Sequence, residues 1–350
     1  MSIMTAWDPN RTDYRALQND WHVVARSQDV QDGAIVPVRL LGEDLIVWRD
    51  AGDVHAWKDY CRHRGARLSL GWVKGGRVIC PYHGWEYGGD GACKRYPAHP
   101  SMKPSARATA FTHEAQERYG YIWVCIGTPA ADVPPFPVWD DATFRKVQAG
   151  PYHYKANGLR AIENFLDAAH FPFVHANLNG NPDAPDEIED YEVSLSDQGL
   201  STSEIKVFQP FGDHRGIPVT ARYRYHCFRP TTAYFNKKTG ETERFCTFMA
   251  VTPCDLDACI VRLTVAINFG WDLSVDQILA RQDKVFDQDR LIVESQRPAP
   301  LPLNPKDEMH LRSDRLGIEY RRWVRALGGD GPMPADRTPA GSNVMEVAGS

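Results

Sequence analysis

Short apolar runs separated by glycine and aspartate turns dominate the chain from Trp21 to about Gly127. Two examples are the runs at 45–48 (Leu-Ile-Val-Trp) and 121–125 (Tyr-Ile-Trp-Val-Cys), which are rich in β-branched and aromatic side chains. Runs of this length and composition are typical of strands rather than helices. The first third of the chain is therefore expected to form a small all-β domain.

A proline-rich segment follows, in which Pro129, Pro134, Pro135 and Pro137 are closely spaced. Proline lacks an amide hydrogen and fixes φ, so this segment propagates neither a helix nor a strand ladder and is expected to be a linker. The later pattern predicts an α+β domain, an antiparallel sheet with helices gathered on it. Its predicted elements are helices near 159–171 and 275–297 and strands at 201–209, 220–228, 244–252 and 259–270.

These signals predict five parts along the chain. They are an N-terminal segment packed on the second domain (1–17), the β domain (18–128), the linker (129–137), the second domain (138–328) and a tail (329–350). The tail is rich in Gly, Pro, Ala and Asp and has little to bury, so it is expected to be flexible.

Charge and composition exclude several classes of function. The chain has 350 residues and a formal net charge of -5, with a pI near 6.2. It therefore has no general electrostatic reason to bind nucleic acid or an anionic membrane surface. Its first residues lack the apolar core of a signal sequence, and its apolar runs are too short to span a bilayer. We expect a soluble, cytoplasmic protein with reduced thiols.

Two cysteines and two histidines stand in mixed pairs. Cys61 and His63 form Cys-x-His, and after sixteen intervening residues Cys80 and His83 form Cys-x-x-His. Two thiolates and two imidazoles are the ligands of a Rieske [2Fe–2S] cluster. A zinc site uses the same ligand types, but zinc fingers place cysteine pairs and histidine pairs apart, which favours the cluster. The remaining six cysteines are expected to be small buried hydrophobes.

A second motif offers ligands for a single metal ion. His170 and His175 are five residues apart with Pro172 between them, so the helix is expected to break at Phe171 and bring both imidazoles to one ion. A 2-His-1-carboxylate site then needs an acid. In the helix at 275–297, which begins with a predicted capping box of Ser274 and Gln277, two acids compete.

Asp289 lies on the apolar face of that helix with Val285, Phe286, Ile292 and Val293, whereas Asp287 lies on the polar face. A buried carboxylate needs a positive partner, so we expect Asp289 to bind the metal, with a salt bridge to a core arginine as the alternative. Asp167, three residues before His170, is expected to accept its second ring N–H. Asn164 is expected either to border the metal or to be a solvent-facing or capping amide.

With both motifs in order, the chain resembles the oxygenase component of the Rieske non-haem iron oxygenases. The resemblance covers nearly the whole chain and implies a Rieske domain followed by a helix-grip catalytic domain, assembled as a homotrimer. It implies that Asp167 bridges His170 and, in a neighbouring subunit, His83. It also supports Asp289 as the ligand. The spacing of Asn164 and Asp167 is that of the monooxygenase and demethylase branch. Segments 295–303, 313–315 and 320–323 are similar to saxitoxin-pathway hydroxylases.

The resemblance implies two cofactors, a [2Fe–2S] Rieske cluster and a mononuclear non-haem Fe(II). It also implies a separate NAD(P)H-dependent reductase, with or without a ferredoxin. The expected activity is hydroxylation or oxidative demethylation of a small aromatic, heterocyclic or polar organic substrate with O2. The alternatives are cis-dihydroxylation of an aromatic ring and, in another class, a Rieske electron-transfer protein. Arg222, Arg224 and His226 share one face of a predicted strand. That face is expected either to meet solvent or a subunit neighbour, or to line a pocket for a carboxylate or other polar substrate.

Overall fold

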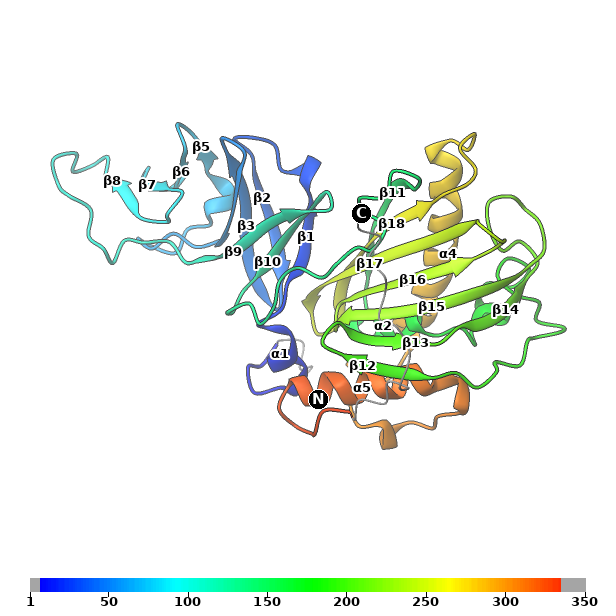
Figure 1. The fold of residues 1–350 in the computed structure, drawn as a ribbon. Coiled ribbons are helices and arrows are strands. Elements are labelled where there is room, and N and C mark those ends of the chain that lie inside the picture. Colours follow the sequence, from blue (N-terminus) through cyan, green and yellow to red (C-terminus); the bar gives the residue numbers. More distant parts are fainter. Residues whose placement is uncertain (1–6, 335–350) are drawn as a thin grey trace. The chain divides into compact units, whose positions relative to one another are not determined.

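The computed structural model describes residues 7–334 and divides the chain into two compact units (Figure 1). The N-terminal unit is Gln18–Val133, and the C-terminal unit combines Met1–Leu17 with Pro134–Ser350. The flexibility predicted for 329–350 falls, from residue 335 on, outside the described residues. No helix within 7–334 has the length and hydrophobicity that crossing a bilayer requires.

Two antiparallel sheets build the N-terminal unit. The six-stranded sheet has the order β1-β10-β9-β4-β3-β2, and the four-stranded sheet has the order β5-β6-β7-β8. Two 3-10 turns, η1 (Ser27–Asp29) and η2 (Leu68–Leu70), complete the unit. The strands are β1 (His22–Arg26), β2 (Ile35–Leu40), β3 (Glu43–Asp50), β4 (Asp53–Lys58), β5 (Trp72–Val73), β6 (Arg77–Ile79), β7 (Glu86–Gly88), β8 (Cys93–Arg95), β9 (Thr112–Arg118) and β10 (Tyr121–Cys125).

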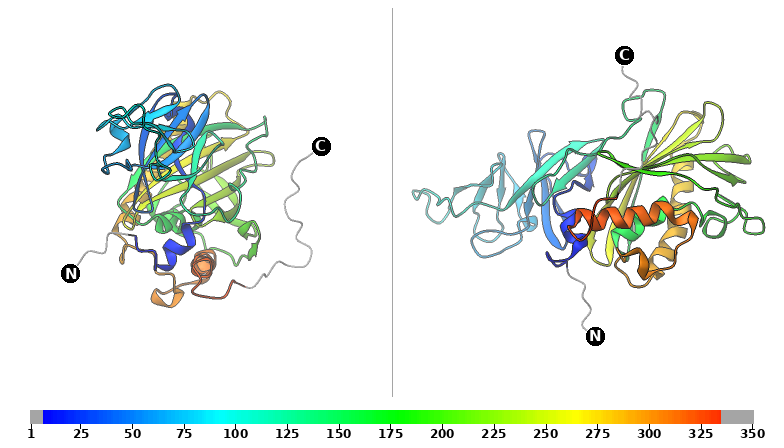
Figure 2. Two further views of the ribbon diagram at one scale, coloured as in Figure 1. Left: turned by 90° about the vertical axis from the view of Figure 1, so that its left-hand side faces the viewer. Right: turned by 60° about the horizontal axis from the view of Figure 1, so that its bottom comes forward.

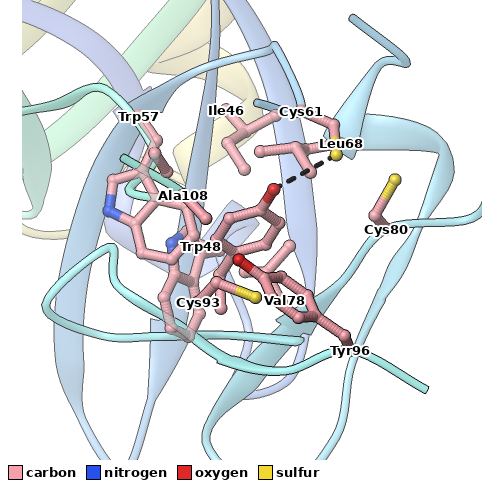
Figure 3. Packing of buried hydrophobic residues seen from close by; sticks show 12 residues of the cluster. Ile46, Trp48, Trp57, Cys61, Leu68, Val78, Cys80, Cys93, Tyr96 and Ala108 are labelled. Atoms are coloured by element: carbon pink, nitrogen blue, oxygen red, sulfur yellow. Dashed lines mark hydrogen bonds between the residues drawn. The ribbon is translucent and has the colours of Figure 1, made fainter. Parts of the chain in front are cut away.

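Three two-residue turns set the register of the larger sheet. Leu41-Gly42, Ala51-Gly52 and Tyr119-Gly120 each have positive φ at both positions, and each joins two neighbouring strands. Such turns match the twist of a hairpin, and their second position suits glycine because it has no Cβ. The register carries Trp48 and Trp57 into a buried cluster that also holds Cys61 and Cys80, whose sulfurs lie at one edge (Figure 3).

The C-terminal unit confirms the predicted α+β class. Its eight-stranded antiparallel sheet has the order β11-β18-β17-β16-β15-β13-β12, with β14 also paired to β15, and helices α2, α4 and α5 lie on one side of it (Figure 2). The strands are β11 (Arg145–Tyr154), β12 (Val193–Ser196), β13 (Gly199–Thr202), β14 (Ile205–Gln209), β15 (Val219–Arg229), β16 (Thr232–Lys238), β17 (Arg244–Asp255) and β18 (Ala258–Ile267). The helices are α1 (Thr12–Leu17), α2 (Gly158–Leu166), α3 (Phe171–Val174), α4 (Val275–Ser295), α5 (Arg315–Leu327) and the 3-10 turns η3 (Pro305–Asp307) and η4 (Arg312–Asp314).

The helix predicted at 159–171 is wrong in its second half. Helix α2 ends at Leu166, and a separate turn, α3, begins at Phe171 with Pro172 in its first turn. Proline is tolerated there because the amide hydrogen it lacks would have no partner in a first helical turn. Pro172 therefore starts a helix where we expected it to end one, and His170 and His175 cap the two ends of that turn.

The predicted strand at 201–209 is two strands, β13 and β14, because the chain leaves the ladder between them. The expectation for α4 holds better: Ser274 and Gln277 form the predicted capping box, and Asp289 is only 5% exposed. Ile292, expected on the same buried face, is 47% exposed. The six remaining cysteines are free and buried, as expected.

A buried network of charges holds α2 in place. Arg321 of α5 forms two hydrogen bonds to Glu163 of α2, at 2.5 and 2.8 Å, and also bonds Glu308. Arg160, which like Arg321 is 2% exposed, bonds Glu308 at 3.0 Å. Two buried arginines thus share two carboxylates, and this network anchors the helix that leads to Asp167.

Candidate metal centres

Two loops of the N-terminal unit present the predicted cluster ligands, and they share one backbone pattern. The amide of Gly65 donates to the carbonyl of Cys61 at 2.9 Å, and that of Gly84 donates to the carbonyl of Cys80 at 3.0 Å. Both glycines have φ near +70°. A side chain at either position would be strained, so glycine allows each loop to curl tightly around its cysteine.

The two loops orient sulfur inward and nitrogen outward. Cys61 and Cys80 are each 1% exposed, whereas the residues of His63 and His83 are exposed. The rings of His63 and His83 lie 4.5 Å apart between centroids. A hydrogen bond between the two thiols lowers the pKa of Cys61 and raises that of Cys80, and Tyr87 contacts the Cys61 sulfur at 3.2 Å.

This arrangement fits a binuclear cluster better than a single zinc ion. Within residues 7–334, no three of these four side chains bring ligand atoms within 4.8 Å of one another. A tetrahedral zinc site needs all four ligand atoms about one ion, at roughly 2.0–2.3 Å from it. In a Rieske cluster the two thiolates bind one iron and the two imidazoles the other, which permits the wider separation.

In the C-terminal unit, His170, His175 and Asp289 converge. The two Nε2 atoms lie 3.3 Å apart, and Asp289 Oδ1 lies 3.5 Å from His170 Nε2 and 3.2 Å from His175 Nε2. Three ligand atoms at this spacing can each lie about 2.0–2.2 Å from one ion. In the described part of the chain this is the single set of three such residues that could hold a metal ion.

The second ring nitrogen of each histidine has its own acceptor. His170 Nδ1 lies 2.9 Å from Asp167 Oδ2, and His175 Nδ1 lies 3.0 Å from Gln288 Oε1. An N–H at Nδ1 leaves the lone pair on Nε2, and Nε2 is the atom that faces the position where the three side chains converge. Burial opposes charge on His170, but Asp167 and Asp289 outweigh it and raise the pKa of that imidazole, so the site attracts a positive charge.

The contact between Asp167 and His170 forms as expected, but the backbone between them is not the helix that we predicted. Asp167 is not within a helix with His170 but follows the last residue of α2, and its carboxylate accepts the amides of Ala169 and His170 at 2.9 and 3.2 Å. These bonds turn the chain back and bring His170 onto the carboxylate. Asn164 lies beside the site, with Nδ2 3.5 Å from Asp289 Oδ1.

Gln288 is the contact that the sequence did not reveal. Its neighbours Asp287 and Asp289 drew attention as competing acids, and Asp287 is indeed exposed and paired with Arg290. The partner of Gln288 lies 113 residues away in the chain, so no local spacing links them. The sequence offers one hint: a glutamine side chain has an amide oxygen that can accept the ring N–H of a histidine.

An aromatic pocket opens beside the three converging residues, which form part of its lining. Arg222 and Arg224 are exposed on β15 and are not part of the lining of this pocket, whereas Tyr223 between them is. The aromatic residues of the lining are Phe165, Phe171, Tyr223, Phe235, Phe245 and Phe286.

Comparison with known proteins yields two family matches and several relatives. Residues 20–110 match the Rieske [2Fe-2S] domain, and residues 154–329 match the vanillate O-demethylase oxygenase C-terminal domain. Methylxanthine N1-demethylase NdmA of Pseudomonas putida is 29% identical over 322 residues, which is 89% of each chain. The probable methylxanthine N7-demethylase NdmC of Pseudomonas sp. (strain TJI-51) is 34% identical over 212 residues, or 59% of this chain and 74% of the relative.

The structure of Pseudomonas putida CBB5 NdmA with caffeine has a TM-score of 0.80 and 27% identity, over 94% of this chain and 100% of that one. The first matched domain contains the four predicted cluster ligands, and the second contains the converging residues His170, His175 and Asp289. A Rieske protein that only transfers electrons would not need the second set. The chain belongs to the Rieske non-haem iron oxygenases, as a terminal oxygenase component with a [2Fe–2S] cluster and a mononuclear iron site.

Proposed function

We propose that this oxygenase hydroxylates or oxidatively demethylates a small aromatic or heterocyclic substrate. The observation that carries the proposal is a pocket that joins His170, His175 and Asp289 to walls of aromatic side chains. Flat rings pack well against such walls. The similarity to NdmA and NdmC, both named as methylxanthine demethylases, supports demethylation in particular.

In this proposal, each cofactor has a defined set of ligands. Two cysteines and two histidines hold the cluster (Cys61, His63, Cys80 and His83), and two histidines and one aspartate hold the iron (His170, His175 and Asp289). When bound, the cluster supplies electrons singly and the iron supplies the open positions at which O2 is reduced.

The chain's own groups orient these ligands and the substrate. Asp167 and Gln288 accept the Nδ1 hydrogens of His170 and His175 and hold the rings at fixed angles. Asn164 borders Asp289 and the pocket, so its amide can contact a bound substrate. The aromatic walls exclude water and leave the reacting carbon at the ligand end of the pocket.

The overall reaction consumes O2, two electrons and two protons. One oxygen atom enters a C–H bond of the substrate, and the other leaves as water. If the carbon is an O- or N-methyl group, the bond from the heteroatom to the hydroxymethyl carbon breaks, the hydroxyl proton passes to the heteroatom, and formaldehyde departs.

The proposal includes a partner and an assembly. Rieske oxygenases need a reductase, and here we propose a separate NAD(P)H-dependent one. We also propose a homotrimer in which Asp167 bridges His170 and a neighbouring subunit's copy of His83. Two observations support the bridge: the Asp167 side chain remains 32% exposed, and the residue of His83 is exposed on its own unit.

The test is turnover with an NAD(P)H-dependent Rieske reductase and a panel of N-methylxanthines and methoxybenzoates. We expect formaldehyde to form in step with O2 uptake for at least one compound, and His175→Ala to abolish it. Cis-diol formation without formaldehyde would instead support ring dihydroxylation. Cluster reoxidation by O2 with no organic product from any compound would contradict the proposal.

A further inference from the structure

The aromatic pocket contains two cationic side chains in addition to the residues at its ligand end. Lys237 of β16 and Arg281 of α4 both line it. Lys237 is only 3% exposed. Desolvation is the main cause that lowers the pKa of each, and for Lys237 the neighbouring charge of Arg281 lowers it further. A buried lysine near a half-buried arginine is unfavourable for folding, which is a common mark of a binding site.

The sheet places Lys237 within a row of aromatic residues. Lys237 pairs across the sheet with Tyr223 and Phe245, and its Nζ lies 5.4 and 5.3 Å from the centroids of their rings. In the next row Phe235 pairs with Thr247, which is 1% exposed and lines the same pocket. The hydroxyl of Thr247 has no hydrogen-bond partner among residues 7–334. The sheet therefore contributes a cation and an unused hydroxyl to the pocket lining.

The carboxylates nearby do not neutralise this end of the pocket. Asp213 is 1% exposed and bonds Arg215 at 2.7 Å, and Arg215 also bonds Glu243 at 3.1 Å. These three residues leave one negative charge against the two positive charges of Lys237 and Arg281. The end of the pocket is thus one negative charge short of balance.

Both cations retain unused donors. Nη2 of Arg281 donates to Asn179 Oδ1 at 2.9 Å and to the carbonyl of Phe211 at 2.7 Å, while Nε and Nη1 make no hydrogen bond within the described part of the chain. Lys237 donates to the carbonyl of Gly212, which leaves two of its three hydrogens. Donors of this kind, on residues that line a pocket, match the oxygens of a carboxylate.

The spacing of residues along helix α4 gives the distance from Arg281 to Asp289. Arg281, Val285 and Asp289 all line the pocket and recur every four residues, so they lie on one stripe of the helix. Eight residues of α-helix separate Arg281 from Asp289 by about 12 Å along the axis. Asp289 therefore lines the pocket about 12 Å along the helix from Arg281.

We infer that the substrate is an aromatic or heteroaromatic carboxylate whose acid group binds Lys237, Arg281 and Thr247, with the reacting carbon at the other end of the pocket. This inference rests on the proposed function, because it names the class of substrate that the same pocket takes. In this inference Lys237 and Arg281 determine which substrate the pocket selects.

The test compares the three methoxybenzoates with the matching methoxybenzamides, which have nearly the same shape but are neutral and have an NH2 group in place of one carboxylate oxygen. Binding to the iron-loaded chain is measured anaerobically by calorimetry, so that no turnover is needed. We expect at least one methoxybenzoate to bind roughly ten- to a hundredfold more tightly than its amide, the range of a charge-assisted hydrogen bond. Lys237→Met and Arg281→Met should each remove most of that preference.

Lys238→Met provides the matched control, because Lys238 is the next residue of β16 and faces the other side of the sheet. It should leave the preference unchanged. Equal binding of acids and amides by the unmodified chain, or no binding of any acid at millimolar concentration, would overturn the inference, as would a preference that survives both pocket substitutions. If the proposed function alone fails, the preference persists without any oxidised product; if this inference alone fails, neutral substrates are oxidised.

Discussion

Asp167→Asn removes one negative charge and keeps the shape of the side chain. The carboxylate accepts three hydrogen bonds: from the amides of Ala169 and His170 and from the Nδ1 of His170. An asparagine has one oxygen to accept with, and its amide hydrogens repel the Nδ1–H. His170 therefore loses a charged acceptor and part of what orients its ring.

The structure sets the size of the effect. A hydrogen bond to a charged group contributes about 1.5–3 kcal/mol, and the Asp167 side chain is 32% exposed, so solvent screening places it at the lower end, about 1.5–2 kcal/mol. Such a loss corresponds to roughly ten- to thirtyfold weaker iron(II) binding. Turnover should fall at least as far, because a misaligned ligand also affects the reaction.

The assay is anaerobic titration of iron(II) into chain that holds its cluster but lacks the mononuclear metal, with chelator competition to obtain the dissociation constant. Asp190→Asn is the control, because it removes a carboxylate from the same unit that is 61% exposed and weakly paired. It should leave affinity unchanged. Equal affinity and equal turnover for Asp167→Asn and the control would refute the role given to Asp167.

The remaining predictions concern stability, the second histidine and the cluster. Glu163→Gln leaves a buried arginine short of a partner and should lower the free energy of unfolding by about 3 kcal/mol in denaturant titration, whereas Glu319→Gln, in an exposed pair, should lower it by less than about 1 kcal/mol. Gln288→Leu removes a neutral acceptor and should weaken iron(II) binding about fivefold. An unchanged dissociation constant for iron(II) would contradict the role given to Gln288. Cys80→Ser should abolish the visible absorption of the cluster and Cys93→Ser should keep it; loss in both would mean a folding defect.

The features that could be predicted from the sequence are those set by short spacing. The capping box of α4 follows from Ser274 and Gln277, three residues apart, and the burial of Asp289 follows from its place on the helix. In both cases the controlling contacts lie within one or two turns of helix. Local periodicity is reliable at that range.

Other features depend on contacts that no local pattern records. Strand β11 contains Gly150 and Pro151, which normally interrupt a strand, and it was missed because a shift of register between Ala149 and Tyr152 accommodates them. Strand β16 was missed as well, since Lys237 is a charged residue at a buried position. The burial of Lys237 is explained by its place in the pocket lining, which the sequence does not show.

Pro172 shows how a correct principle gave a wrong boundary. Proline does end helices, but it also fits the first turn of one, and the two outcomes look alike in sequence. The preceding carboxylate decides between them: by accepting two backbone amides, Asp167 turns the chain and lets a new helical turn begin at Phe171.

The most direct measurement is the iron content of purified, anaerobically loaded chain with Asp289→Asn, beside Asp287→Asn from the exposed face of the same helix. The unmodified chain and Asp287→Asn should hold about three iron atoms, two in the cluster and one at the second site. Asp289→Asn should hold about two, with the cluster spectrum intact and oxygenation lost. Three iron atoms and full oxygenation in Asp289→Asn would contradict the assignment of the second centre.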